Sequence, residues 1–367
     1  MKVLSIFGTR PEAIKMAPVV RELAQTPGIE SRVCVTAQHR EMLDQVLTLF
    51  DIQPDVDLNL MRPDQSLAEL TARVFTHLDP VLADIQPDWV LVQGDTTTVM
   101  AAALNAYYRR IRVGHVEAGL RTHNKWEPFP EEVNRRVAGV AADIHFAPTK
   151  WSRQNLLKEG VPEDIIYVTG NPVIDALYFV AEQPVPTTVA SLLSKLRSKR
   201  LILVTAHRRE NHGEPIKDIC AALKSLALRS DVEIVYPVHL NPNVQKPVKR
   251  LLGNIPNITL LPPLEYLPLV HLMKKADLIL TDSGGIQEEA PAFGVPVLVL
   301  RDVTERPEGI QAGTLKLVGT NQMKIVNEAN YLLNDSKAHA AMAQAVNPFG
   351  MGDAAKKIVA NLLKFGT

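Results

Sequence analysis

The sequence predicts an α/β protein made of two doubly wound, Rossmann-like domains that face a cleft. Three observations predict this fold. Short apolar runs of strand length alternate with amphipathic stretches of helix length, the alternation occurs in two successive series, and 367 residues are too many for one ordinary core. Alternation of this kind is typical of βαβ units, whose parallel strands are buried on both faces of the sheet.

The first series of apolar runs lies in the N-terminal half of the chain. Amphipathic stretches at 41–50, 67–82 and 98–108 separate several of these runs and have the length of helices. The strands predicted for this half are 3–7, 32–36, 89–93, 112–116, 145–147 and 165–169.

A proline-containing stretch at 182–188 separates the two series, and its two prolines oppose continued helix or strand. We therefore expect an N-terminal domain at 1–181 and a C-terminal domain at 182–352. A last helix at 353–367 is expected to pack back on the first domain. The strands predicted for the second half are 201–205, 233–235, 258–261, 278–281, 297–300 and 315–318.

Composition narrows the class of partner. Forty basic and forty acidic side chains leave no net charge, which argues against nucleic acid or an anionic membrane as the main partner. No apolar run is long enough to span a bilayer, and the N-terminal run 3–7 is too short for a signal peptide. Cys34 and Cys220 each lie in an apolar pattern typical of buried thiols in a reducing compartment. We expect a cytoplasmic protein.

The stretch 276–290 combines an apolar strand, a glycine turn and a helix start. Backbone N–H groups at such a turn can bind a phosphate, and Gly284 and Gly285 carry no Cβ that would keep the anion away. Glu288 and Glu289 are predicted in the first helical turn, where one could stabilise the helix start and the other accept hydrogen bonds from a ribose diol. The alternative is an ordinary strand-to-helix turn that binds nothing.

Polar residues follow several strands of the first half, where open parallel sheets bind ligands. Arg10 and Lys15 follow the first strand and could hold a phosphate, or they could be surface cations on a helix start. Asp95 follows the third strand and could instead cap a helix. Glu117 ends an otherwise apolar strand, and its alternative is a buried ion pair with Arg121.

A loop at 122–130, rich in proline and aromatic residues, leads to the next acid. Glu131 follows this loop at a predicted helix start, so the loop could deliver its carboxylate to the site. The alternative is a charged helix cap.

The second half offers cations at its strand ends. His207 and Arg208 follow its first strand, His239 follows its second, and Arg306 follows the strand after the glycine turn. No metal-ligand spacing is present, and the first strand is not followed by a dinucleotide-binding glycine motif or a Walker loop. The sequence therefore suggests neither a metal nor NAD.

The chain resembles the non-hydrolysing UDP-N-acetylglucosamine 2-epimerases of bacteria along nearly its whole length. The resemblance implies a glycosyltransferase-B-type fold, a homodimer, and reversible conversion of UDP-GlcNAc to UDP-ManNAc without NAD or an obligatory metal. Six motifs in family order carry it: 7–18, 36–44, 94–98, 115–121, 207–210 and 281–291.

By resemblance, the reaction eliminates UDP to leave a 2-acetamidoglucal and then adds UDP back with the opposite configuration at C2. Asp95, Glu117 and Glu131 match the three catalytic carboxylates of the family, and inversion at C2 does call for more than one acid or base. The resemblance adds His207 to the catalytic group. It assigns the remaining contacts with substrate to Arg10, Lys15, Leu264, Leu269, Ser283, Gly284, Gly285, Glu289 and Arg306.

The sequence also departs from the family pattern. Leu264 and Leu269 stand where many relatives have Gln and Phe, which removes an aromatic ring that could stack on uracil. The resemblance implies a regulatory UDP-GlcNAc site at Gln38, Arg208 and His239. Glu41 stands where some relatives have Gln, which argues against activation by substrate.

Three other functions fit parts of the pattern. A glycosyltransferase of the same fold would also hold UDP at the glycine turn, but one base would suffice for it. An epimerase acting on a UDP-diacetamido-uronic acid would differ in the loop near the sugar. A nucleotide-sugar sensor without catalysis could lose the acids, whereas Asp95, Glu117 and Glu131 are all present. The three acids favour the epimerase.

Overall fold

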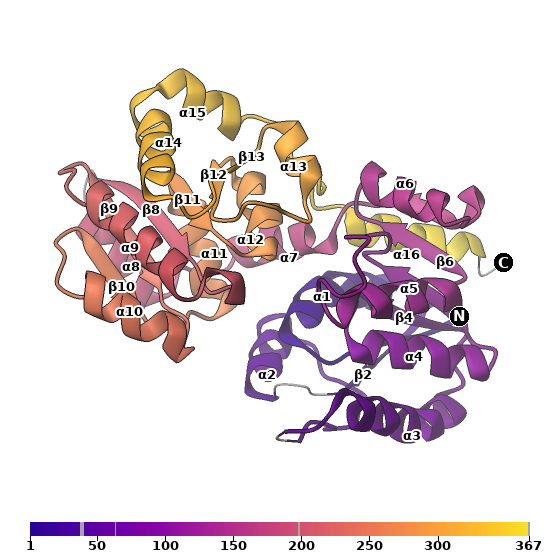
Figure 1. Ribbon diagram of the computed structural model, residues 1–367. Helices are drawn as coiled ribbons and strands as arrows, with labels where there is room; N and C mark the ends of the chain where they lie inside the picture. The colour runs from indigo at the N-terminus through magenta and orange to yellow at the C-terminus, as the bar shows by residue number, and fades with distance from the viewer. Residues whose placement is uncertain (37–39, 63, 197–198, 366–367) are drawn as a thin grey trace. The chain divides into compact units, whose positions relative to one another are not determined.

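The computed structural model describes residues 1–36, 40–62, 64–196 and 199–365. The chain divides into two compact units. Unit 1 comprises 1–176 and 349–367, and unit 2 comprises 177–348. The division falls inside helix α7 (Pro172–Ala181), between residues 176 and 177. Both chain termini belong to unit 1 (Figure 1).

Unit 1 contains a seven-stranded parallel sheet in the order β3-β2-β1-β4-β5-β6-β7. Its strands read as continuous apolar runs because helices cover both faces. The strands are β1 (Lys2–Phe7), β2 (Glu30–Val35), β3 (Val56–Asp57), β4 (Trp89–Gln93), β5 (Arg112–Val116), β6 (Ile144–Ala147) and β7 (Ile166–Val168).

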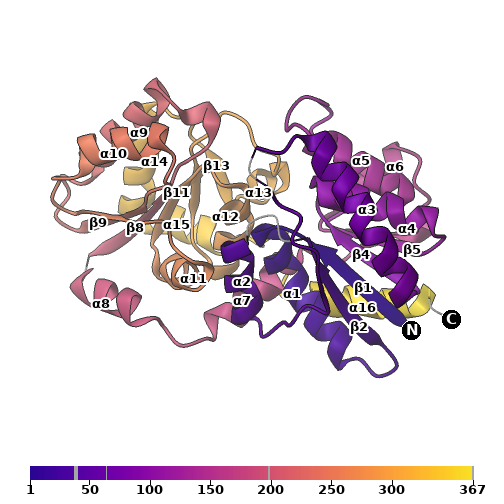
Figure 2. The ribbon, with the colours of Figure 1, turned by 90° about the horizontal axis from the view of Figure 1, so that it is seen from below.

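Two helix layers enclose this sheet (Figure 2). In one layer α3 packs on α4 and α4 on α5, and in the other α1 packs on α2 and α16. The helices are α1 (Arg10–Gln25), α2 (Arg40–Leu49), α3 (Leu67–Ile85), α4 (Thr97–Tyr108), α5 (Glu131–Ala141), α6 (Lys150–Lys158) and α16 (Ala354–Phe365), with a short 3₁₀ turn η1 (Glu163–Ile165).

The C-terminal helix α16 belongs to unit 1 although it follows all of unit 2 in the chain. The Asp175 carboxylate on α7 accepts the backbone N–H groups of Ala354 and Ala355 at 3.2 and 3.0 Å, which satisfies the start of α16. At its other end the Phe365 ring meets the edges of Trp89 and Tyr167. These contacts fix α16 beside α1 (Figure 2).

Unit 2 contains a six-stranded parallel sheet in the order β10-β9-β8-β11-β12-β13. Two parallel doubly wound sheets were predicted from the alternating pattern, and this part of the prediction is confirmed. The strands are β8 (Arg200–Thr205), β9 (Val232–Pro237), β10 (Ile258–Leu261), β11 (Leu278–Thr281), β12 (Val297–Val299) and β13 (Leu315–Leu317).

Helices also cover this second sheet. On one side α9 packs on α10 and α14, and α14 on α15; on the other, α11 packs on α8 and on the 3₁₀ turn η3. The helical segments are α8 (Thr187–Leu196), η2 (Arg209–Asn211), α9 (Glu214–Leu226), α10 (Pro242–Leu252), α11 (Tyr266–Lys275), α12 (Gly284–Glu289), η3 (Ala290–Phe293), α13 (Pro307–Ala312), α14 (Gln322–Asn334) and α15 (Ser336–Ala343).

Candidate active-site residues

Each sheet has one point where the strand order reverses, and several predicted site residues follow the strands on either side of it. In unit 1 the reversal lies between β1 and β4, and in unit 2 between β8 and β11. Chain segments that leave two such strands diverge to opposite faces, which opens a crevice at the carboxyl ends where ligands bind in folds of this kind. Arg10 and Asp95 follow the first pair of strands, and His207 and Ser283 follow the second.

In unit 1 a carboxylate of α1 itself accepts hydrogen bonds from the backbone N–H groups just before this helix. The buried Glu12 carboxylate accepts the backbone N–H groups of Gly8 and Thr9 at 2.8 and 2.7 Å, and the Thr96 hydroxyl at 2.5 Å. Thr9 caps the helix in return, which completes a capping box. Burial raises the pKa of Glu12 although these hydrogen bonds oppose the shift. These two amides are therefore occupied, and the phosphate contacts predicted for Arg10 and Lys15 stay predictions.

Glu117 is held more firmly than its place after an apolar strand suggested. Its backbone has φ +62°, a left-handed conformation that costs a non-glycine residue roughly 1–2 kcal/mol. Its buried carboxylate accepts Lys15 Nζ at 2.5 Å, Asn171 Nδ2 at 2.8 Å and the Gln93 side-chain amide.

Arg121 does not pair with Glu117, so that alternative is wrong. Its guanidinium forms a two-bond pair with Glu159, with Nε to Oε1 at 2.9 Å and Nη2 to Oε2 at 2.7 Å. Lys15–Glu117 and Arg121–Glu159 are therefore two separate ion pairs that share no residue.

Asp95 lies in the same unit between a cation and an acid. Its carboxylate contacts Arg135 at 2.5 Å, and its backbone carbonyl accepts Asn134 Nδ2 at 3.0 Å. Burial and the charge of Glu117 raise the pKa of Asp95, while Arg135 and Lys15 oppose the shift without cancelling it. The interpretation of Asp95 as a helix cap is wrong, because Thr96 caps α4.

The side chain that secures Asp95 to the following loop was not predicted from the sequence. Glu132 is fully buried and accepts the backbone N–H groups of Thr122 and His123, each at 3.1 Å. It also lies 3.4 Å from Arg135. Helix α5 thereby joins the loop 122–130 to Asp95.

Glu131 is the first residue of the same helix and is partly exposed. No hydrogen bond or ion pair of its carboxylate is found among the residues that the structure describes. Glu132, rather than Glu131, anchors the loop 122–130. Its predicted catalytic role stays a prediction.

In unit 2 the fully buried Asp282 joins the two strands at the reversal. Asp282 Oδ2 accepts the backbone N–H groups of His207 and Arg208, both at 2.8 Å, and Asn211 Nδ2 at 2.9 Å. The Thr205 and Thr281 hydroxyls meet 2.6 Å apart beneath this contact. Asp282 therefore fixes the loop that carries His207.

The imidazole of His207 stacks on that of His239, with ring centroids 5.4 Å apart and 16° between the planes. The backbone N–H of Asn241 donates to His239 Nδ1 at 3.1 Å. Two of the three residues assigned to a regulatory site, Arg208 and His239, thus lie beside His207. The third, Gln38, lies outside the described residues.

The guanidinium of Arg306 lies against the glycine turn at Gly284. A Cβ on Gly284 would lie 3.0 Å from the Cζ and Nη1 atoms of Arg306, so a larger residue would push the guanidinium away. Arg306 pairs with the buried Glu288 at 2.7 Å and with Glu305 at 3.5 Å. Arg306, which was predicted to bind a phosphate, is therefore already paired with neighbouring carboxylates.

The glycine turn itself starts α12 without a side-chain cap from Ser283. The prediction that Glu288 and Glu289 lie in the first helical turn is wrong, because α12 begins at Gly284 and both acids fall in its second turn. Glu288 therefore binds Arg306 rather than the helix start.

Glu289 is also buried, and its carboxylate accepts the Tyr266 hydroxyl at 2.5 Å. Tyr266 was missed from the sequence, although it begins α11 between the predicted residues Leu264 and Leu269. Those two leucines are both half-buried. Tyr266 thereby orients Glu289, the residue that is predicted to bind a ribose.

The described residues contain no group of three or more His, Cys, Asp or Glu side chains able to hold a metal ion. None of their helices combines the length and apolar character needed to cross a membrane. Burial raises the pKa of the free thiols of Cys34 and Cys220 to about 12, which makes both unreactive.

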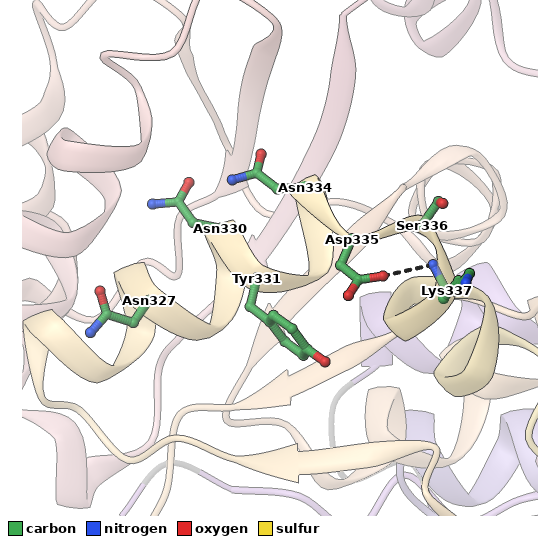
Figure 3. Close-up of a pocket in the computed structure, with 7 residues that line it drawn as sticks. All are labelled: Asn327, Asn330, Tyr331, Asn334, Asp335, Ser336 and Lys337. Carbon is green, nitrogen blue, oxygen red and sulfur yellow. Dashed lines mark hydrogen bonds between the residues drawn. The ribbon is translucent and has the colours of Figure 1, made fainter.

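Two surface hollows contain none of the predicted residues. One of about 560 Å³ lies on α14 and the start of α15 (Figure 3), and the other, of about 640 Å³, lies at the end of α2. Asn330, Tyr331, Asn334 and Asp335 line the first hollow. Two of these asparagines accept hydrogen bonds from Arg229, so their carbonyl oxygens serve the packing of α14.

The two doubly wound units, with acids at one strand reversal and cations at the other, define a glycosyltransferase-B-type protein. A glycosyltransferase from Rickettsia africae has the same fold, with a TM-score of 0.65 at 14% identity over 99% of this chain and 98% of that one. The chain belongs to the UDP-N-acetylglucosamine 2-epimerase family, whose model matches residues 21–363.

Relatives with that description match nearly end to end. The UDP-N-acetylglucosamine 2-epimerase of Escherichia coli strain K12 is 56% identical over 98% of this chain and 97% of its own length. The crystal structure of UDP-GlcNAc 2-epimerase from Neisseria meningitidis bound to UDP-GlcNAc has a TM-score of 0.92 at 54% identity, covering 99% and 100%. The S. aureus MnaA–UDP co-structure has a TM-score of 0.91 at 48% identity, covering 99% and 96%.

Proposed function

We propose that the protein reversibly epimerises UDP-N-acetylglucosamine at C2 to UDP-N-acetylmannosamine. Family membership and the similarity to an enzyme bound to UDP-GlcNAc support the substrate. The observation that carries the chemistry is the group of carboxylates in unit 1, where Asp95 and Glu117 lie beside Lys15.

The proposed reaction is an elimination followed by an addition. A base removes the proton at C2, a double bond forms between C1 and C2, and the C1–O bond breaks so that UDP leaves with its electron pair. The 2-acetamidoglucal then takes a proton on the opposite face of C2 while UDP bonds again to C1. Proton transfers by Asp95, Glu117 and Glu131 would each contribute about 10²- to 10⁴-fold.

In the same proposal unit 2 holds the leaving group. Charge develops on the diphosphate as the C1–O bond breaks, and preorganised cations and backbone amides stabilise such charge. Arg306, His207 and the Ser283-Gly284-Gly285 turn supply them, and unit 1 adds Arg10. Glu289, oriented by Tyr266, binds the ribose, while Leu264 and Leu269 contact the uracil.

A glycosyltransferase is the nearest competing function, but the likeness to the Rickettsia enzyme supports the fold alone. Incubation with UDP-GlcNAc in D₂O, followed by NMR, distinguishes the two. We expect UDP-ManNAc to form with deuterium at C2, without an acceptor, NAD or added metal. No exchange at C2 and no UDP-ManNAc would contradict the proposal, and UDP release that requires an added acceptor would favour the transferase.

We further propose that the enzyme is a cytoplasmic homodimer that supplies precursors for cell-surface polysaccharide. Light scattering on the purified chain tests the dimer. Gln38, Arg208 and His239 remain our proposed regulatory residues. A sigmoidal dependence of rate on UDP-GlcNAc would support them. Because Glu41 stands where some relatives have Gln, we expect activation by substrate to be weak.

A further inference from the structure

The buried Asp282 has two oxygens in different environments. Asp282 Oδ2 accepts two backbone N–H groups and the Asn211 side chain, which accounts for its charge and position. Asp282 Oδ1 has no hydrogen-bond partner within the described residues, although the side chain is completely buried. A buried carboxylate oxygen without a donor is unfavourable, so the position calls for a partner.

The atom that faces Asp282 Oδ1 is Nδ1 of His207, at 3.4 Å. This distance exceeds that of a formed hydrogen bond, and a small rotation of the imidazole would close it. Hydrogen bonds between catalytic groups are often long in ligand-free proteins and shorten when the ligand binds. The His207 backbone cannot move away, because its own N–H is held by the same carboxylate at 2.8 Å.

Charged and titratable groups surround the His207 ring. Asp282 faces one ring nitrogen, His239 stacks on the ring face, and Arg208 and His212 lie nearby. Burial lowers the pKa of His207, and His239, Arg208 and His212 lower it further, against the opposing charge of Asp282. The ring is therefore mainly neutral near pH 7 before a ligand binds, and the position of its single proton matters.

We infer that Asp282 is a positioning residue that fixes His207 with its proton on Nδ1 and leaves Nε2 directed to the ligand. The inference rests on the proposed function. When the diphosphate binds, Nε2 takes a proton from solvent, the imidazolium is balanced by Asp282, and its Nε2–H donates a hydrogen bond to a phosphate oxygen. No covalent bond to the ligand forms.

A purely structural Asp282 would hold the loop through Oδ2 and have no effect on the ring. The two roles differ in the tautomer of His207, which ¹⁵N NMR reads on the unmodified protein without any turnover. We expect the neutral ring to carry its proton on Nδ1. A ring protonated on Nε2, with a bare Nδ1, would overturn the inference even if the enzyme is a fully active epimerase.

Asp282→Asn tests the same point by activity. The amide oxygen can still accept the loop N–H groups, while its NH₂ group faces Nδ1 and forces the proton to Nε2. We expect the inverted tautomer and a kcat lower by about 10²- to 10⁴-fold. As a matched control, Asn211→Ala removes a donor from Oδ2 and from the Leu300 carbonyl and leaves Oδ1 unchanged. It should keep the native tautomer and kcat within about threefold, because neither bond involves the His207 ring.

A double variant separates action through His207 from general damage. If Asp282 acts through the ring, Asp282→Asn combined with His207→Gln loses no more activity than His207→Gln alone. Losses that multiply would show that Asp282 acts independently and would refute the inference. If Asp282→Asn does not fold, the tautomer in the unmodified protein still decides. Failure of the proposed function is a separate result, namely no exchange at C2 by the unmodified protein.

Discussion

The strand reversals of the two units share a topology but place their carboxylates differently. In unit 1 the acid Glu12 lies inside α1, and it turns back to take the amides of Gly8 and Thr9. In unit 2 the acid Asp282 lies before α12, and it reaches sideways to the loop of His207. The first arrangement closes a helix start to anions, and the second leaves the Ser283 turn without a side-chain cap. Position relative to the turn, rather than sheet order, decides which backbone groups remain for a ligand.

The ion pairs of the two units also differ. In unit 1 the acids Glu117 and Asp95 pair with Lys15 and Arg135, and Arg135 also contacts Glu132. Unit 2 surrounds its cation Arg306 with Glu288 and Glu305. We infer that unit 1 is organised to present carboxylates for proton transfer and unit 2 to present cations for a diphosphate.

Removing a carboxylate from unit 1 is the strongest test of this contrast. For Asp95→Asn we expect kcat to fall by about 10²- to 10⁴-fold, because a proton-transferring group is lost. The affinity for UDP should stay within about threefold of the unmodified protein, since no direct contact with UDP is lost. Glu131→Gln should behave alike. Turnover is measured by NMR and UDP binding by calorimetry.

Glu159→Gln serves as the control for an acid in unit 1 outside the proposed site, because Glu159 pairs with Arg121 instead. It should keep most of the activity. If Asp95→Asn lost UDP binding together with turnover, Asp95 would be a structural residue and the division of roles between the units would be wrong.

The next largest effect is expected in unit 2. Arg306→Met removes the guanidinium, and we expect UDP affinity to fall about 10- to 100-fold, the size of a hydrogen bond to a charged group. It also leaves the buried Glu288 without this cation, which costs about 3–5 kcal/mol in comparable pairs. Thermal unfolding should therefore show a lower Tm.

Adding Glu288→Gln to Arg306→Met separates the two losses. The neutral amide no longer needs a cation, so the double variant should recover much of the Tm while UDP affinity stays low. Recovery of UDP affinity as well would mean that Arg306 acts only by packing against Glu288, and it would remove Arg306 from the proposed diphosphate site.

The fold and the regions of the site could be predicted from the sequence because both depend on local patterns. Apolar runs define β1 and β11, and parallel strands bring their carboxyl ends to one edge of each sheet. Asp95, Glu117 and His207 were identified from their places after such strands. The loop 122–130 indicated a carboxylate at Glu131, whereas resemblance to the family assigned its catalytic role and added Leu264, which no local pattern could have assigned.

The partners of these residues could not be predicted, since they depend on long-range contacts. Asn171 reaches Glu117 from 54 residues away, and Tyr266 reaches Glu289 from another helix. Arg121 seemed the natural partner of Glu117 by proximity in sequence, yet the lysine on α1 takes that place. A single sequence shows which charges occur at a strand end but not which opposite charge the fold brings there.

The smallest expected effect concerns Arg135, which acts on Asp95 through charge. Arg135 lowers the pKa of Asp95 against the larger effect of burial, so its removal should raise that pKa further. If Asp95 must be ionised to accept a proton, the acid limb of kcat/KM for Arg135→Met moves to higher pH and the rate on the alkaline side changes little. Arg135→Lys should restore part of the shift. The neighbouring Arg136 is exposed and pairs with Glu159, so Arg136→Met should leave the pH profile unchanged. An equal shift in both variants would show a general charge effect, and no shift in Arg135→Met would mean that Asp95 does not titrate in the rate-limiting step.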